Sequence, residues 1–434
     1  MTANFFGSGS FLIYTVKPGR MNEDVLIALA LLVITVAVWY TSHRESGFWK
    51  KLYTFVPPMI LLFLIPSILG SFDIIPGGDS ASARFALSTL LPITLLLMTM
   101  TINFHDILAL SRKSVMIFLA GTVGIVVGGP VALWIVGQFS PDLLADKGSD
   151  SVWRGLVCIT GAWINGTPGQ TSMKEIFGAS NELYFIMIAV DAVMQNLWLA
   201  LLLFGVRSSG WLDRMLKADP QDLATIQQAG FEKSQQREKH VIHNKPGKII
   251  QLVAVALIGF GIVYSLTQIM TGYFTAQHIP DASVWSFLAK PSFWLVFFST
   301  TLGIGLSFTR ARQLEAVGAT EVGNFFFYFL FSAIGLKMNL FRLGGQWEFI
   351  LVCAIWLLIH LAVLVAAARL MRGSYFFVAV GSQANIGGPA TASMLASAFN
   401  PHLTSVGVLL GVLSNVIGNY CGLLAGILYR WIAG

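Results

Sequence analysis

The chain has 434 residues, of which 55% are hydrophobic and only 11% are charged. A soluble globular protein carries about 25% charged residues, so this composition excludes a protein whose whole surface faces water. The net charge of +6 does not indicate nucleic-acid binding, because the basic residues lie scattered between apolar blocks instead of forming a basic stripe.

The apolar residues form blocks of the length that a bilayer requires. A hydrocarbon core about 30 Å thick is crossed by roughly 20 mostly apolar residues in a helix. In chain order, we expect helices at 25–42, 52–70, 85–102, 114–137, 183–206, 249–270, 291–308, 322–336, 349–367 and 402–429. Two further segments, 152–178 and 373–398, are apolar but interrupted by Gly, Pro and polar residues. The sequence therefore predicts an all-α polytopic membrane protein.

The long hydrophilic stretch 207–248 divides the chain into an N-terminal half, 1–206, and a C-terminal half, 249–434. Lys and Arg occur in the connections near 43–51, 103–113, 309–321 and 368–372, whereas the connection 138–151 is rich in Asp. Because basic loops stay in the cytoplasm, we place the linker 207–248 inside and the Asp-rich loop outside. This orientation requires segment 152–178 to return to its own side as a re-entrant hairpin. A broken helix that crosses the membrane remains the alternative.

The two interrupted segments resemble each other. The first reads Ile164-Asn-Gly-Thr-Pro-Gly-Gln-Thr-Ser-Met173, and the second reads Asn385-Ile-Gly-Gly-Pro-Ala-Thr-Ala-Ser-Met394. One constant offset, without a gap, relates Gly166 to Gly387 and Pro168 to Pro389. A weaker echo joins Asn103 to Asn339, each at the end of an apolar span, and the loop charges give these two spans opposite directions. The pattern is typical of inverted-repeat transporters.

Matched Gly, Pro and polar residues in both halves are the best pointer from sequence to the binding site of such a transporter. Backbone that leaves its helix cannot face lipid and persists only when it is buried in protein or lines a wet cavity. The structural alternative is that Gly and Pro only allow kinks and close helix packing. The repetition of the motif favours a site.

The polar groups around the two breaks suit a small polar or anionic solute. Helices that start after each Pro would direct free N–H groups and positive dipole ends toward the centre. The residues that we expect to bind substrate are Asn165, Thr167, Gln170, Thr171, Lys174, Gln383, Asn385, Thr391 and Ser393. Lys174 would offer positive charge to an acidic substrate, although a local pair with Glu175 is the alternative.

Oxygen atoms near the breaks also suit a small hard cation such as sodium. The expected cation-binding residues are Gly166, Asp191, Gln383, Asn385 and Asn415. Asp191 stands alone in the 183–206 span, and a carboxylate inside the membrane is a functional candidate. His360 lies in the middle of a span, where a histidine is more often a hydrogen-bonded packing residue than a titrating group.

The sequence contains no nucleophile elbow and no phosphate-binding Gly-Lys-Ser/Thr loop. We therefore expect no enzymatic activity and no cofactor other than a coupling ion, Na⁺ or H⁺.

The stretches Gly161–Pro168, Ser382–Ala392 and Gly407–Leu413 resemble a bacterial inner-membrane family catalogued as a domain of unknown function. That family is similar to cation:proton antiporters, bile-acid sodium symporters and sodium/glutamate symporters. The resemblance implies a scaffold domain, a mobile core domain that carries the broken helices, an elevator-type motion, a homodimer and a location in the bacterial inner membrane. Antiporters of that group carry paired acidic or Asn-Asp residues after the first broken helix, where this chain has only Asp191, preceded by Val190.

The leading hypothesis is a sodium- or proton-coupled symporter of a small organic anion, amino acid or short peptide-like solute. The alternatives are a sodium/proton antiporter and, from another class, a membrane sensor.

Overall fold

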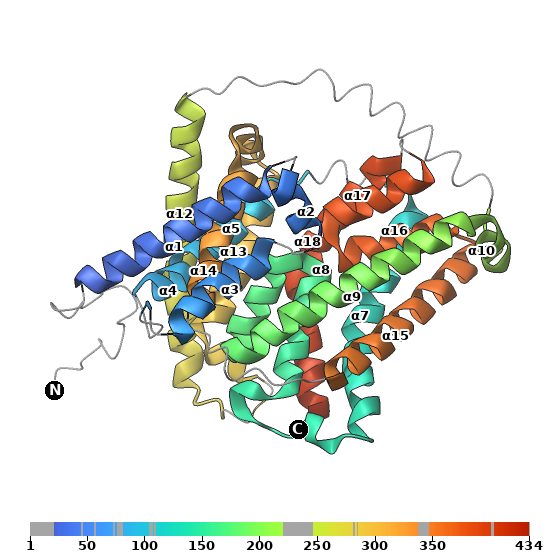
Figure 1. Ribbon diagram of the computed structural model, residues 1–434, viewed down its shortest axis with the longest axis horizontal. Helices are drawn as coiled ribbons and strands as arrows, with labels where there is room; N and C mark the ends of the chain where they lie inside the picture. The colour runs from blue at the N-terminus through green and yellow to red at the C-terminus, as the bar shows by residue number, and fades with distance from the viewer. Residues whose placement is uncertain are drawn as a thin grey trace. The chain divides into compact units, whose positions relative to one another are not determined.

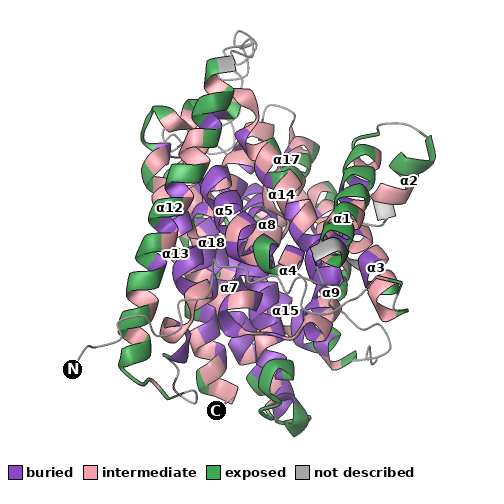
Figure 2. Cartoon of the chain, turned by 90° about the vertical axis from the view of Figure 1, so that its left-hand side faces the viewer, coloured by how far each residue is buried: buried purple, intermediate pink, exposed green. Residues whose placement is uncertain are grey.

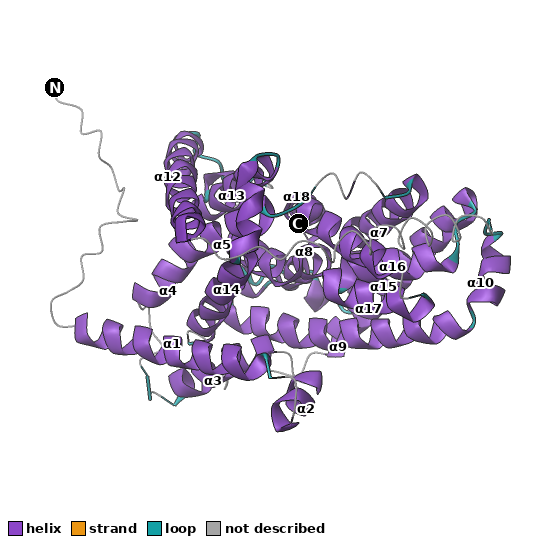
Figure 3. Ribbon diagram, turned by 90° about the horizontal axis from the view of Figure 1, so that it is seen from above, coloured by secondary structure: helices purple, strands orange, loops and turns teal. Residues whose placement is uncertain are grey.

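The computed structural model describes residues 21–44, 47–55, 58–72, 74–75, 81–103, 107, 110–219, 246–280, 283, 285–336, 347–400 and 403–433. Within these ranges the regular elements are all helices, and no strand occurs (Figure 3). This confirms the predicted all-α membrane fold.

Six helices in the described ranges are long and apolar enough to cross a membrane. They are α1 (Met21–Ser42), α7 (Arg112–Gly137), α9 (Asn181–Arg207), α12 (Pro246–Ala276), α15 (Trp347–Met371) and α18 (Thr404–Ala433). At 1.5 Å per residue, even the 22 residues of α1 extend about 33 Å, which exceeds the bilayer core. A bend of 97° separates α13 (Pro291–Ser307) from the short helix η5 (Arg310–Val317), and together these two form a seventh candidate span.

The remaining helices are shorter or broken. They are α2 (Gly47–Phe55), α3 (Pro58–Ser71), α4 (Ala81–Phe85), η1 (Ala86–Leu90), α5 (Leu91–Met100), η2 (Pro141–Leu143), η3 (Gly148–Asp150), α8 (Val152–Phe177), α10 (Ser209–Leu216), η4 (Ser286–Ala289), α14 (Ala319–Gly335), α16 (Tyr375–Ile386) and α17 (Gly388–Phe399). Of these, α8 has 26 residues but is broken in its middle.

The chain forms two compact units, which draw residues from both halves of the sequence. One contains Met1–Leu91 and Phe325–Arg342, and the other contains Pro92–Asn324 and Leu343–Gly434. In the first unit, buried hydroxyls join helices: Thr35 Oγ1 donates to Ser332 Oγ at 3.2 Å, and Ser67 Oγ donates to Gly335 O at 2.8 Å. Such interhelical hydrogen bonds stabilise packing in lipid, where the hydrophobic effect contributes little.

In the second unit, α8 is a helical hairpin, called hairpin 1 below. Its two ends lie together, since Ser180 N donates to Ser149 O at 2.9 Å and the rings of Trp153 and Phe177 are 6.0 Å apart. Halfway along, a Cβ at Gly161 would lie 2.4 Å from Gly169 O, so the two arms touch through their backbones. The segment therefore returns to its own side, as the loop charges require.

Helices α16 and α17 form the corresponding hairpin 2. The rings of Tyr375 and Phe376 at its start lie 6.0 and 5.4 Å from the ring of Phe399 at its end. Near the turn, Gln383 Nε2 donates to Thr391 Oγ1 across the two arms at 3.0 Å. Both interrupted segments are thus helical hairpins whose two ends lie together, which is the geometry expected of re-entrant segments.

The two hairpins approach α18 from opposite ends. At the open end of hairpin 1, Phe177 lies against Gly426 of α18. At the tip of the same hairpin, Asn165 lies against Gly418. Hairpin 2 packs along the other half of α18, where Figure 1 shows α17 near the end opposite the C-terminus. This antiparallel entry supports the inverted arrangement that the loop charges predict. That residues 23–206 superpose on residues 249–430 after rotation about an axis in the membrane plane stays a prediction.

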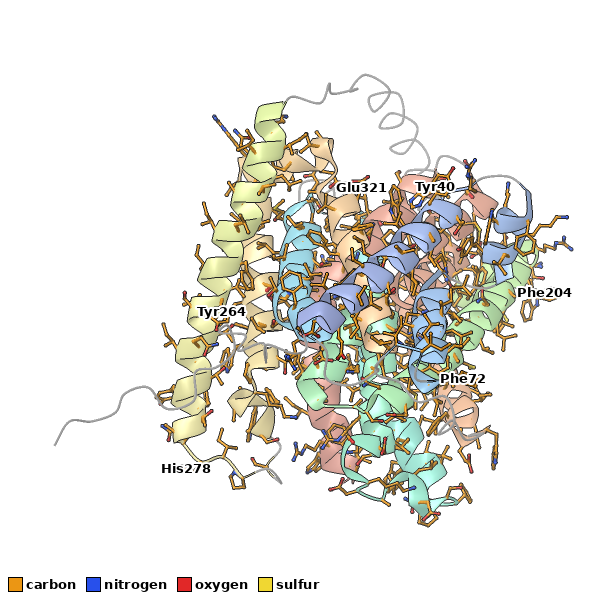
Figure 4. The ribbon with its side chains drawn as sticks, turned by 60° about the vertical axis from the view of Figure 1, so that its left-hand side comes forward. Tyr40, Phe72, Phe204, Tyr264, His278 and Glu321 are labelled. Atoms are coloured by element: carbon orange, nitrogen blue, oxygen red, sulfur yellow. The ribbon has the colours of Figure 1, made fainter. Side chains whose placement is uncertain are left out.

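Burial distinguishes the interior of the second unit from its lipid-facing helices. Buried residues concentrate on α7 and α8, and every residue of α16 is buried, whereas α12 shows exposed residues along its length (Figure 2). Apolar side chains cover the outward faces: Phe204 on α9 is 71% exposed and lies at the edge of the ribbon (Figure 4), and Ile258 on α12 is 64% exposed. Large apolar surfaces of this kind face lipid in a membrane protein.

The ten apolar segments that we expected are helical where they are described, except for one or two residues at the C-terminal ends of 85–102, 291–308 and 322–336. The linker 207–248 is partly helical, because α10 occupies its first residues and α12 begins at Pro246.

Residues 220–245 and Asn339 lie outside the described residues. Asn103 Oδ1 accepts a hydrogen bond of 2.7 Å from Arg312 Nη1.

Candidate functional site

The tip of hairpin 1 is the turn Asn165–Gly166. Asn165 has φ −130° and ψ 15°, and Gly166 has φ 62° and ψ −157°, a conformation that only glycine adopts without strain. The carbonyl of Ile164, which this break frees from its helix, accepts a hydrogen bond of 2.5 Å from Ser414 Oγ of α18. The predicted break at 164–169 is confirmed.

The tip of hairpin 2 is the turn Gly387–Gly388. Helix α16 ends when Gly387 N donates to Gln383 O at 2.8 Å, and Gly388 has φ 72°. Pro389 then begins the second arm. A backbone N–H at the start of a helix has no helical acceptor, and proline has no N–H to leave unpaired there. The predicted break at 385–390 is confirmed.

Both tips contact the same face of α18. A Cβ at Gly411 would lie 2.5 Å from Pro389 Cα, and a Cβ at Gly418 would lie 2.3 Å from Asn165 Cβ. Seven residues of α-helix separate these glycines, which is about 10 Å along the axis. The half-buried Asn415 and the buried Ser414 lie between them. The tips therefore lie on the same face of α18, about two turns apart.

A chain of neutral hydrogen bonds fixes the tip of hairpin 1. Asn165 Nδ2 donates to Asn419 Oδ1 at 2.9 Å, and Asn419 Nδ2 donates to Thr300 Oγ1 of α13 at 2.8 Å. All three residues are buried. Neither Asn419 nor Thr300 was among the predicted site residues, although an Asn in an apolar span directly after Gly418 is a signal that could have identified Asn419.

Two buried amide atoms near the tips have no hydrogen-bond partner among the described residues: Gln170 Nε2 on hairpin 1 and Gln383 Oε1 on hairpin 2. Gln170 lies one turn before Met173 and two turns before Phe177, which both contact α18. A buried polar group without a partner costs about 1–3 kcal/mol. These two predicted residues thus offer one donor and one acceptor to a ligand.

The side chain of Asn385 holds hairpin 2 on α7. Its Oδ1 accepts from Thr122 Oγ1 at 2.8 Å, and its Nδ2 donates to Phe118 O at 3.2 Å and to Gly381 O at 3.0 Å. An asparagine amide with these three bonds leaves little capacity for a solute. Its side chain therefore fixes the position of the turn that follows it.

His360, on α15, belongs to a second hydrogen-bond network, which includes Ser382 on the first arm of hairpin 2. Its Nδ1 lies 2.9 Å from Gly121 O and its Nε2 lies 2.8 Å from Ser382 Oγ, which also accepts from Trp198 Nε1 at 2.8 Å. Because a carbonyl only accepts, Nδ1 carries the proton and Nε2 accepts from the Ser382 hydroxyl. His360 is therefore a hydrogen-bonded packing residue.

The carboxylate of Asp191 is buried and faces hairpin 1. Its Oδ1 accepts from Trp163 Nε1 at 2.8 Å and from Gln195 Nε2 at 2.9 Å. The ring of Trp163 packs on Trp356 at 4.3 Å, so the donor is held in place. Asp191 thus lies beside the arm of hairpin 1 that leads to Asn165.

Other predicted residues lie along the arms. Thr171 Oγ1 is 2.7 Å from Tyr184 OH, and Lys174 Nζ forms an ion pair of 2.7 Å with Glu175, which is the local pair that we considered. Ser393 Oγ donates to Ala390 O at 2.7 Å. Thr167 and Gly166 are half-buried at the tip of hairpin 1. The described residues contain no group of three or more His, Cys, Asp or Glu that could hold a metal ion.

Comparison with known proteins agrees with a membrane protein. The chain is 26% identical over 323 residues to an uncharacterized membrane protein of Bacillus subtilis (strain 168), YjcL, and the match covers 72% of this chain and 74% of that protein. The family described as "Protein of unknown function (DUF819)" matches residues 28–432, which is nearly the whole chain, including both hairpins. The chain is a multi-pass membrane protein that belongs to the DUF819 family.

Proposed function

We propose that this chain is a secondary active transporter of a small polar solute in the bacterial inner membrane. The observation that carries the proposal is that two re-entrant hairpins, entering from opposite ends, place their tips on the same face of α18, about two turns apart. Irregular backbone at membrane depth is tolerated where it is buried in protein or lines a cavity, and in transporters it forms the substrate site.

The solute that fits this site is small and carries both a hydrogen-bond acceptor and a donor. Gln170 Nε2 requires an acceptor, such as a carboxylate oxygen, and Gln383 Oε1 requires a donor, such as an ammonium or amide N–H. The second arms of both hairpins begin at the tips, so their positive dipole ends add attraction for an anionic group. An amino acid or a short peptide-like solute meets these conditions, and so does an organic anion that carries a hydroxyl or amide group.

The coupling ion in this proposal is sodium, bound by neutral oxygens at the tips. Hydroxyl, amide and carbonyl oxygens are the ligands that hard cations take, and Asn415, Gln383 and the carbonyl of Gly166 supply them. Proton coupling is the alternative, with Asp191 as the carrier. An elevator-type motion of the hairpins and a homodimeric assembly complete the proposal.

A sodium/proton antiporter is the second candidate, and the burial of Asp191 next to hairpin 1 favours it. The two candidates can be distinguished by transport assays, because an antiporter exchanges Na⁺ for H⁺ in proteoliposomes that contain no organic solute.

The test combines a binding screen with matched variants. Purified protein is screened for thermal stabilisation by amino acids and small organic anions with and without Na⁺; a solute at 100 times its Kd stabilises by about 2.7 kcal/mol. Gln170→Ala and Gln383→Ala should lose this stabilisation, whereas Ser397→Ala, whose hydroxyl only bonds to Met394 O on α17, should keep it. Proteoliposomes that take up no screened solute under either a sodium or a proton gradient would overturn the proposal.

A further inference from the structure

The open end of hairpin 2 is held by a short helix that belongs to a different part of the chain. Asp213 on α10 accepts a hydrogen bond of 2.6 Å from Tyr375 N, the first residue of hairpin 2. The residue in the capping position, Ser374, makes no capping bond with its own side chain, and its buried Oγ has no hydrogen-bond partner. The cap of this helix is therefore supplied by Asp213, from outside the hairpin.

Further bonds join the same corner to hairpin 2 and α15. Tyr375 OH donates to Leu202 O of α9 at 3.0 Å, and a Cβ at Gly205 would lie 2.1 Å from that hydroxyl. Arg369 Nη1 donates to Met215 O, and Asp219 N donates to Arg372 O at 2.9 Å. The corner between α9 and α10 thus contacts both the last turn of α15 and the first turn of hairpin 2.

The strength of the cap suits a reversible contact. A carboxylate at a helix N-terminus satisfies a free N–H and complements the helix dipole, and the loss of such a cap typically costs about 1 kcal/mol. Alternative conformations of a protein differ by a few kcal/mol, so one cap changes their ratio without locking either of them. Asp213 itself is half-buried, whereas the residues that it caps, Ser374 and Tyr375, are buried, so breakage of this bond would expose them.

We propose that Asp213 is a positioning residue that holds the open end of hairpin 2 on α10, and that hairpin 2 moves when this bond breaks. The inference about hairpin position stands on the contacts alone. Its consequence for transport rests on the proposed function, so the two are measured separately.

The first measurement needs no solute. Ser374→Cys places a thiol in the buried capping position, in a Cys421→Ala background where the remaining native cysteines, Cys158 and Cys353, are buried. Asp213→Ala should raise the thiol labelling rate roughly five-fold, which is the population change that corresponds to about 1 kcal/mol for the lost cap. Asp213→Asn retains an oxygen that accepts from Tyr375 N, so it should restore most of the protection.

Two control variants separate this role from general destabilisation. Arg214→Ala alters α10 at an exposed side chain whose hydrogen bond within the described residues goes to Gly210 O, and Asp142→Ala removes an exposed carboxylate from the 138–151 loop. Both should label at the parent rate. An unchanged labelling rate in Asp213→Ala, or an equal rise in all the variants together with a lower melting temperature, would overturn the inference. Once a solute is identified, a changed KM for uptake in Asp213→Ala adds the transport consequence, whereas absence of any uptake in the parent protein counts against the proposed function only.

Discussion

The contact between Gly418 and the tip of hairpin 1 allows a prediction with a magnitude. In Gly418→Ala, the new Cβ would lie 2.3 Å from Asn165 Cβ and 3.0 Å from Asn165 Cα and N. Two of these three atoms are backbone at a turn that Ser414 and Asn419 already fix, so the tip cannot move aside without loss of those bonds. Overpacking of this kind costs typically 1–3 kcal/mol.

The matched control is Gly261→Ala on α12, where a Cβ would have no neighbour within 4 Å. Both variants gain the helix propensity of Ala over Gly, about 1 kcal/mol, so the difference between them isolates the contact with Asn165. We expect Gly418→Ala to be about 1–3 kcal/mol less stable than Gly261→Ala by SDS titration in mixed micelles, and to lose solute-dependent stabilisation. Equal stability of the two variants would show that hairpin 1 does not pack on α18 at Gly418.

Three further predictions concern polar contacts. The pKa of Asp146 lies below its usual value because its carboxylate accepts hydrogen bonds from the Ser151 hydroxyl and the Gly148 N–H, so Ser151→Ala should raise this pKa. The stability that the ionised carboxylate contributes above its unfolded pKa then becomes smaller. A carbon-13 titration of labelled aspartate measures the shift. Asp191→Asn should weaken ion dependence more than solute binding, because an amide oxygen still accepts from Trp163; unchanged ion dependence eliminates Asp191 as the coupling group. Thr122→Val should destabilise by about 1–3 kcal/mol in the same SDS titration, because it leaves Asn385 Oδ1 buried without its donor; Thr122→Ser should restore stability, and a stable Val variant contradicts this role.

The breaks were predictable from sequence because their causes are local. Gly166 and Gly388 adopt positive φ, and Pro168 and Pro389 remove helical donors, so residue types alone mark where the helices end. The choice between a crossing helix and a hairpin was not local. It depends on whether the two arms pack against each other, and the backbone contact of Gly161 with Gly169 decides it.

The roles of individual site residues were less predictable, because each role depends on a partner from a distant segment. Asn385 bonds to Thr122 on α7 and Thr171 bonds to Tyr184 on α9, so their side chains hold the hairpins in place. Gln383 retains an oxygen without a partner, although its nitrogen reaches Thr391. No feature of the motifs distinguishes these cases, since in sequence they are all neutral polar residues beside Gly and Pro.

The packing on α18 also limits how the hairpins can act. Ser414 bonds to the carbonyl that the break in hairpin 1 frees, and it lies three residues, or about 4.5 Å along the axis, from Gly411 at the tip of hairpin 2. A ligand that bridges the two tips must therefore lie beside Ser414 and Asn415. A shift of either hairpin by one helical turn, about 5.4 Å, would place a different α18 residue against its tip and separate the groups that such a ligand touches. One helix thus positions both tips, and movement of one hairpin along α18 changes the site that the other helps to form.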